Sequence, residues 1–160
     1  MNGWDLCFDT PLGPMGATAT AAGLTRVHFD PSPRAGSACQ DGAEHLRQLQ
    51  VQLQEYFAGQ RRQFDLALVA TGSPFQHQIW ALLNEIPYGD TRSYGELART
   101  LGDVGAARAV GLANAQNPLA IVVPCHRVIG ANGSLTGYAG GLARKRALLE
   151  LEGALSRSLF

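Results

Sequence analysis

Residues 119–130 read LAIVVPCHRVIG, and the rest of the chain is organised around this stretch. Its first five residues are apolar and partly β-branched, and Pro124 ends the run, so we predict a short buried strand over residues 119–123. The strand would deliver Cys125 to the interior, directly before His126. Because the thiolate is the reactive form of cysteine, a thiol of ordinary pKa needs a base nearby. The stretch favours a nucleophilic Cys125, although a cysteine at a strand end is more often a small core residue.

Composition and charge narrow the class of protein. The chain has 160 residues, of which 46% are apolar, and its formal net charge is zero, which is typical of a globular protein. Residues 91–146 nevertheless carry seven basic side chains against two acidic ones. An anionic partner and a solvated helix face explain this segment equally well. The three cysteines form no CxxC pair, which favours a reducing compartment, and we find no signal peptide and no membrane-spanning run.

The first half of the chain predicts an antiparallel meander with one helix. Alternating apolar residues and turn residues indicate short strands, and leucines at helical spacing indicate an amphipathic helix that packs on them. We expect strands at 4–9, 17–20, 24–29 and 63–69, a turn at 10–14, a loop at 31–42 and the helix at 43–57. This half shows no catalytic pattern. The spacing of Cys7, His28, Cys39 and His45 matches no compact zinc site, so we predict no metal.

The second half predicts helices. Thr71-Gly72 marks a boundary between a structural domain, residues 1–72, and a second domain, residues 73–160. Ser73 and Ser93 each open a capping box, and Gly102 separates the second of these helices from a helix at 106–114. Helix, glycine turn and helix are typical of a helix-turn-helix, although many helical hairpins look the same. The fold class is therefore α+β, a small N-terminal antiparallel sheet with a helix, followed by a mainly helical, winged-helix-like domain.

Further motifs surround the central stretch. They are Ser93-Tyr94, Arg108-Ala109-Val110-Gly111, Asn117-Pro118, Pro124-Cys125-His126-Arg127-Val128-Ile129 and Gly137-Tyr138-Ala139-Gly140-Gly141-Leu142. Together they resemble the methylated-DNA–protein-cysteine methyltransferases, also called O6-alkylguanine-DNA alkyltransferases. The PCHRV core is highly specific to that family. The resemblance runs from about residue 73 to residue 153 and is weaker over the first 70 or so residues.

The resemblance implies a DNA repair enzyme, a methylated-DNA–protein-cysteine S-methyltransferase. It would move the alkyl group of O6-alkylguanine, and of O4-alkylthymine, from duplex DNA to Cys125. The damaged nucleotide must first be flipped out, because a base in the stack is out of reach of a thiolate in a pocket. The resulting thioether is not reduced by cellular thiols, so each molecule acts once. We expect duplex DNA as the partner, no cofactor and no membrane, and a monomer in the bacterial cytoplasm that joins the nucleoid when bound to DNA.

The family pattern assigns the catalytic roles. Cys125 would pass its proton through a water to His126, which pairs with Glu152. Tyr94 would contact the phosphate of the flipped nucleotide and protonate a guanine ring nitrogen. On residue type alone, Tyr94 is a core aromatic with a wet tip and Glu152 is a solvated helix end.

The same pattern assigns the DNA contacts and the pocket. Arg108 would fill the space of the extruded base, whereas on residue type alone it contacts a phosphate. The other implied DNA contacts are Ser93, Tyr94, Arg127, Ala109 and Gly111. The implied pocket residues are Asn117, which braces the turn, together with Tyr138, Ala139, Val128 and Trp80. Ala120 and Ala139 depart from common family residues, so the range of accepted alkyl groups stays open.

Two other functions compete with this interpretation. A lesion sensor would flip damaged bases without transferring anything, but family relatives of that kind replace the cysteine that this chain keeps. A Cys-His-Glu hydrolase would turn over and would need an oxyanion site. The DNA-binding features explain neither of these two properties.

Overall fold

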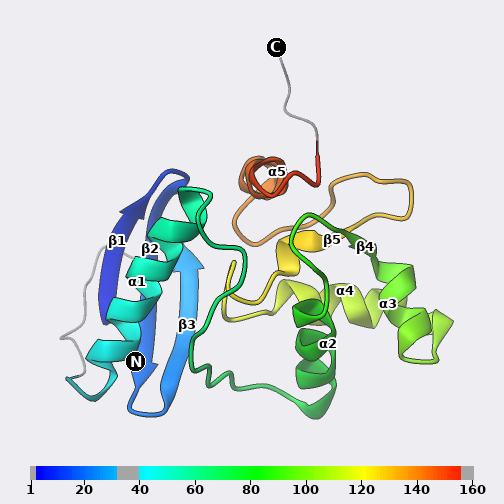
Figure 1. Ribbon diagram of the computed structural model, residues 1–160. Helices are drawn as coiled ribbons and strands as arrows, with labels where there is room; N and C mark the ends of the chain where they lie inside the picture. Colours follow the sequence, from blue (N-terminus) through cyan, green and yellow to red (C-terminus); the bar gives the residue numbers. More distant parts are fainter. Residues whose placement is uncertain (1–2, 32–39, 156–160) are drawn as a thin grey trace. The chain divides into compact units, whose positions relative to one another are not determined.

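A computed structural model describes residues 3–31 and 40–155 of the chain (Figure 1). It has the predicted mixed α+β fold, with a small antiparallel sheet in the first half and helices in the second. The chain divides into two compact units, one formed by residues 1–71 with 118–122 and the other by residues 72–117 with 123–160. The division predicted near residue 72 therefore differs in one segment, because residues 118–122 belong to the first unit.

The sheet of the first unit is the predicted meander. Its strands are β1 (Leu6–Thr10), β2 (Gly13–Thr20) and β3 (Gly23–Phe29), in the order β1-β2-β3. The second strand begins four residues before its predicted start, because Gly13 already pairs with Thr10. The Thr10 hydroxyl donates to the Gly13 carbonyl and accepts from the Leu12 N–H, which closes a loop of only two residues.

Helix α1 (Ala43–Phe57) has the predicted bounds and follows a short 3-10 helix, η1 (Gln40–Gly42). It packs on the sheet through Leu46, Leu49, Leu53 and Tyr56, all of which are buried (Figure 1). The predicted strand at 63–69 is wrong. Only Leu68 forms a bridge there, to Leu24 of β3, because the segment is largely exposed and the Asp65 N–H donates to the side chain of Gln52 instead of to a strand.

The apolar run at 119–123 is buried, but it is not the predicted strand. Leu119 bridges to Val27 of β3, and the chain then turns at Ile121, whose φ is +69°. The Val122 N–H donates to the Ala120 carbonyl over 2.8 Å, which makes this turn a γ-turn of the strained, positive-φ kind. A β-branched residue rarely adopts this conformation. Ile121 is 1% exposed, so its burial in the first unit holds the backbone in this conformation.

The second unit contains α2 (Pro74–Asn84), α3 (Tyr94–Thr100), α4 (Ala107–Ala115) and α5 (Leu142–Leu151). Both predicted capping boxes are present, at Ser73 and at Ser93. Gly102, whose φ is +81°, lies in the turn that follows α3. The 3-10 helix η2 (Val104–Ala106) then leads into α4, and both α2 and α3 pack on α4. Two short parallel strands, β4 (Arg92–Ser93) and β5 (Val128–Ile129), complete the unit. None of the helices in the described ranges is long and apolar enough to span a membrane.

Candidate active site

Cys125 begins a 3-10 turn, η3 (Cys125–Arg127), and is 6% exposed. Its N–H donates to the Val123 carbonyl over 2.8 Å, and Pro124 between them has φ −82° and ψ 64°. These values define an inverse γ-turn, which the fixed φ of proline favours. The Asn117 amide also donates to the Val123 carbonyl, over 2.8 Å, and its side chain bonds the Cys125 thiol. The predicted brace by Asn117 is thus a contact with both the turn and the sulfur.

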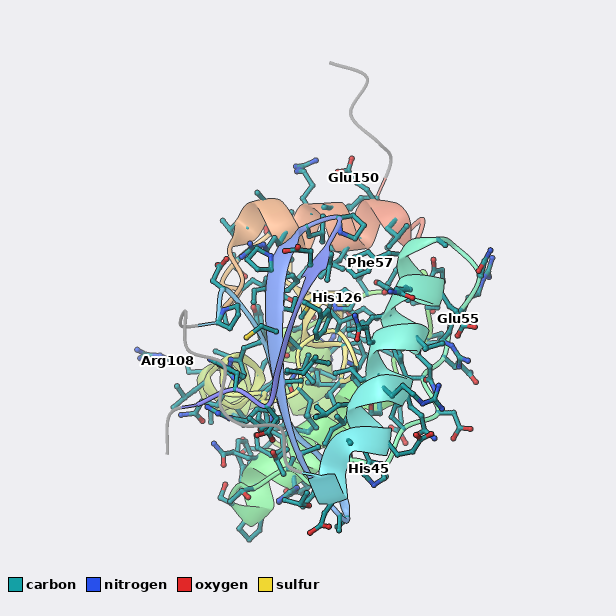
Figure 2. The ribbon with its side chains drawn as sticks, turned by 90° about the vertical axis from the view of Figure 1, so that its left-hand side faces the viewer. His45, Glu55, Phe57, Arg108, His126 and Glu150 are labelled. Atoms are coloured by element: carbon teal, nitrogen blue, oxygen red, sulfur yellow. The ribbon has the colours of Figure 1, made fainter. Side chains whose placement is uncertain are left out.

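His126 lies fully inside the protein, where Figure 2 labels it, and its ring is hydrogen-bonded to Glu152. Its Nε2 is 2.8 Å from Glu152 Oε2, and both side chains are 0% exposed. Since a carboxylate only accepts, His126 donates from Nε2, and Nδ1 is then the ring nitrogen with a lone pair. Among the described residues, Nδ1 has no hydrogen-bond partner. The histidine next to Cys125 therefore presents an available base.

Arg127, which the sequence analysis placed at the DNA, is a buried structural residue instead. It is 7% exposed, its Nε donates to Glu152 Oε1 over 2.8 Å, and its Nη2 donates to Oε2 over 3.0 Å. The Nη1 group donates to the Ile86 carbonyl over 2.7 Å. A guanidinium held in this two-pronged way has no free face for a phosphate. Its role in the structure is to hold Glu152, which in turn holds His126.

The environment sets the protonation states of these groups. Burial raises the pKa of Cys125, against the opposing effects of the Asn117 hydrogen bond and the charge of Lys145. Burial likewise lowers the pKa of His126, although Glu152 favours its cation. Hydrogen bonds from His126 and Arg127 outweigh burial at Glu152 and lower its pKa to about 2. At neutral pH the resting site consequently holds a neutral thiol, a neutral imidazole and a carboxylate.

Lys145 of α5 is a residue that the sequence analysis missed. It is 0% exposed, and its Nζ donates to the carbonyls of Thr136 and Gly137, over 2.7 and 3.4 Å. Burial lowers the pKa of Lys145 to about 8, while the nearby Cys125 favours its cation. The Tyr94 hydroxyl donates to the same Thr136 carbonyl over 3.1 Å. The only sequence signal for Lys145 was a basic residue on the apolar face of a helix.

The remaining predicted pocket residues lie in three kinds of position: buried near Cys125, exposed, or packed between helices. Burial beside Cys125 raises the pKa of Tyr138 well above its ordinary value, and Val128 is fully buried in β5. Ala139 is exposed. Trp80 of α2 has a packing role, because its indole N–H donates to the Ala113 carbonyl of α4 over 2.9 Å and the side chain is 5% exposed.

The predicted DNA-binding residues other than Arg127 lie on α4 and at the start of α3. Arg108 and Ala109 are exposed, and Figure 2 shows Arg108 pointing away from its helix. A Cβ atom on Gly111 would lie 3.6 Å from the ring of Tyr94, so the glycine lies against that tyrosine. Ser93 caps α3, its hydroxyl accepting from the Glu96 N–H.

The described residues contain no group of three His, Cys, Asp or Glu side chains that could hold a metal ion. Cys7 is an exposed free thiol, and Cys39 lies outside the described ranges. The site thus consists of a buried cysteine, a histidine–glutamate pair and the groups that hold them, which is the arrangement of a cysteine nucleophile with an oriented base.

Comparisons with known proteins agree with this class of site. Residues 74–154 match the "6-O-methylguanine DNA methyltransferase, DNA binding domain", and residues 6–70 match the "6-O-methylguanine DNA methyltransferase, ribonuclease-like domain". A methylated-DNA–protein-cysteine methyltransferase of Mycobacterium tuberculosis is 50% identical over 157 residues, covering 91% of this chain and 89% of the relative. One from Methanosarcina acetivorans is 48% identical over 150 residues, covering 92% and 96%.

Solved structures give the same result. The OGT of Mycobacterium tuberculosis in complex with DNA aligns with a TM-score of 0.82 at 46% identity, covering 92% of this chain and 91% of that chain. An O6-methylguanine DNA methyltransferase from Methanococcus jannaschii aligns with a TM-score of 0.69 at 28% identity, covering 97% of each chain. This chain belongs to the methylated-DNA–protein-cysteine methyltransferase family, whose members are DNA repair enzymes.

Proposed function

We propose that this protein repairs O6-alkylguanine in duplex DNA by transferring the alkyl group to Cys125. The observation that carries the proposal is the arrangement of Cys125 beside His126, with His126 Nε2 bound to Glu152 and Nδ1 left as a base. Cys7 is exposed and has no such partners, so Cys125 is the better nucleophile of the two thiols that the structure describes.

The transfer is an in-line displacement in which charges and atoms balance. The Cys125 thiol gives its proton through a water to His126 Nδ1, and the imidazolium is stabilised by the ionised Glu152. The sulfur attacks the alkyl carbon, so the S–C bond forms as the C–O6 bond breaks. As guanine leaves, its ring nitrogen would take the proton of the Tyr94 hydroxyl, which in the resting site donates to the Thr136 carbonyl. The tyrosinate would then regain a proton as the imidazolium loses one, which returns both groups to neutral.

The DNA contacts in this proposal lie on α3 and α4, which would act as a helix-turn-helix. Arg108 is the only basic side chain of α4, and it is exposed, so it is suited to take the place of an extruded nucleotide. Ala109 and Gly111 are small enough to let the helix approach the DNA closely, and Ser93 and Tyr94 lie at the N-terminus of α3. The relative solved in complex with DNA supports DNA as the partner.

The pocket for the flipped base would be built around Cys125. Asn117 holds the turn before the nucleophile, and Tyr138 lies beside the thiol. The Ala139 N–H would bond the guanine oxygen, and backbone carbonyls near Cys125 and Val128 would accept from the exocyclic amine. Lys145 fixes the loop that contains Thr136 and Gly137, so it would shape the same pocket. Residues 1–72 supply a structural domain in this proposal.

Three finer points complete the proposal. O4-alkylthymine is a second substrate, because its alkyl carbon presents the same target to the sulfur. Each molecule acts once, because nothing in the site removes an alkyl group from a thioether. The working form is a monomer that acts on DNA at the bacterial nucleoid.

The intact mass of the protein after mixing with a short duplex tests this function. A duplex with one O6-methylguanine should add one methyl group per protein molecule, and the undamaged duplex should add nothing. Tight binding without a gain in mass would identify a lesion sensor instead, and repeated turnover would identify a hydrolase.

A further inference from the structure

Two buried acceptor atoms next to Cys125 have no hydrogen-bond partner among the described residues: His126 Nδ1 and Asn114 Oδ1. Asn114 lies in the last turn of α4 and is 3% exposed. Its Nδ2 group donates to the Cys125 carbonyl over 3.4 Å, which identifies the other atom of the amide as the oxygen. His126 donates from Nε2 to Glu152, which makes Nδ1 an acceptor. Each side chain therefore uses its donor and keeps an acceptor.

Packing does not explain an amide at position 114. The other buried residues of α4, Val110 and Ala113, are apolar. Leucine has the same branched shape as asparagine and would leave no acceptor unpaired in the interior, where such an atom costs stability. The Cys125 carbonyl already accepts from the Val128 N–H, so it does not depend on Asn114 for a partner. The amide at this position is better explained by a role in the chemistry of Cys125.

One water molecule can satisfy the thiol hydrogen and both of these acceptors. The thiol has one hydrogen to donate, while Asn114 Oδ1 and His126 Nδ1 each need one. A water accepts the thiol hydrogen and donates to both acceptors, which gives the three hydrogen bonds typical of a buried water. We propose that Asn114 is a positioning residue for alkyl transfer, whose Oδ1 orients the water that carries the proton of Cys125 to His126 Nδ1.

The proposal extends the proposed function, because it rests on Cys125 as the alkyl acceptor. When the proton moves, the water passes one hydrogen to Nδ1 and takes the thiol hydrogen. It then accepts from the imidazolium and donates to the thiolate. The bond to Asn114 Oδ1 is the same before and after the transfer, so the water does not reorient away from the sulfur.

Other charged or titratable groups act on this thiol or on His126, and each stays in place in the test below. Lys145 and Tyr138 interact with the thiol, and Glu152, Arg127 and Lys145 act on His126.

Two substitutions separate orientation of the water from packing. Asn114→Leu fills the site and removes the acceptor, whereas Asn114→Ala leaves space that a second water can occupy in place of the amide oxygen. If Asn114 orients the water, Cys125 reacts more slowly in the leucine variant than in the alanine variant. If Asn114 has only a structural role, the alanine variant is impaired more, since it leaves a cavity and the leucine variant does not.

The experiment uses the full chain with Cys7→Ser and Cys39→Ser, so that Cys125 is the sole thiol. The rate of its alkylation by iodoacetamide is measured from pH 6 to pH 11, and transfer from free O6-benzylguanine over the same range. Asn114→Leu should move the midpoint of both profiles up by about one pH unit, about a tenfold loss of rate at neutral pH, and should approach the parent at high pH. The midpoints for Asn114→Ala should lie between those of the parent and those of Asn114→Leu.

Equal slowing at every pH without a shift of the midpoint would overturn the proposal, as would an alanine variant with the larger shift. If Asn114→Leu does not fold, the alanine variant alone decides, because an unshifted midpoint in it, together with slowing at all pH values, assigns Asn114 to packing. Failure of the proposed function is a separate result, namely no gain of mass by the wild type on methylated duplex, and it leaves the iodoacetamide profile untouched.

Discussion

Replacing Arg127 with methionine should destabilise the second unit strongly. The guanidinium makes two hydrogen bonds to Glu152 and one to the Ile86 carbonyl, and it is 7% exposed. Arg127→Met leaves the buried carboxylate with fewer partners, and removing one member of such a pair costs about 3–5 kcal/mol. For a chain of this size, 1 kcal/mol corresponds to about 2–4 °C in Tm, so we expect Tm to fall by about 6–20 °C. Thermal unfolding followed by circular dichroism measures this change.

Arg108→Met is the matched control, because it removes an equal side chain from an exposed position on α4. Its Tm should stay within about 2 °C of the wild type, as expected of a surface substitution. It should slow repair of a methylated duplex and leave the reaction with free O6-benzylguanine unchanged. The reverse pattern, with Arg127→Met stable and deficient only on DNA, would show that Arg127 faces the DNA as its place in the sequence suggested. Equal slowing of Arg108→Met on both substrates would refute a role for Arg108 in flipping.

Three further predictions follow from the site. Cys125→Ser should keep its fold and bind methylated duplex at least as well as undamaged duplex, yet gain no mass; peptide mapping that places the methyl group of the wild type on Cys7 or Cys39 would refute the assignment. Because the pKa of Glu152 is lowered to about 2, its contribution to stability is complete above the ordinary pKa and is lost as the pH falls toward 2; urea unfolding should show a loss of roughly 3 kcal/mol between pH 5 and pH 2 that is missing in Glu152→Gln. Affinity for undamaged duplex should fall with salt by about 0.9 in log affinity per log salt for each phosphate contacted, and a salt-independent affinity would rule out the basic face as the contact.

The elements that the sequence predicted well are those with local causes. The bounds of α1, both capping boxes and the break at Gly102 follow from side chains within a few residues of one another. The run at 119–123 failed because β-branched composition indicates burial but not backbone path. Its bridge to Val27 and the turn at Ile121 depend on a partner strand some ninety residues earlier in the chain, which local periodicity does not contain.

The site residues that the sequence missed depend on long-range pairing. Arg127 sits in a motif beside Cys125, and only the approach of Glu152 from the end of α5 shows that its charge is used internally. Lys145 looks like any basic residue of a helix until its Nζ is seen against the Thr136 carbonyl. Asn114 belongs to neither a motif nor a turn. Its one sequence signal was a polar side chain among the apolar residues of α4.

Burial of the site also bears on how a protein that, in the proposed function, acts once would keep its nucleophile intact. Burial raises the pKa of Cys125 and lowers that of His126, so both groups rest in their neutral forms, and a neutral thiol is a poor target for oxidants and stray electrophiles. The charge-separated pair forms at the cost of desolvation, which Glu152 offsets at the imidazolium and which Asn117 and Lys145 offset at the thiolate. In the proposed reaction the flipped base brings the electrophilic alkyl carbon into the pocket when the charge-separated pair forms. The reactive thiolate is therefore present only together with its substrate. A thiolate formed permanently would react faster with the substrate, but it would also be consumed by side reactions that no step in this site reverses.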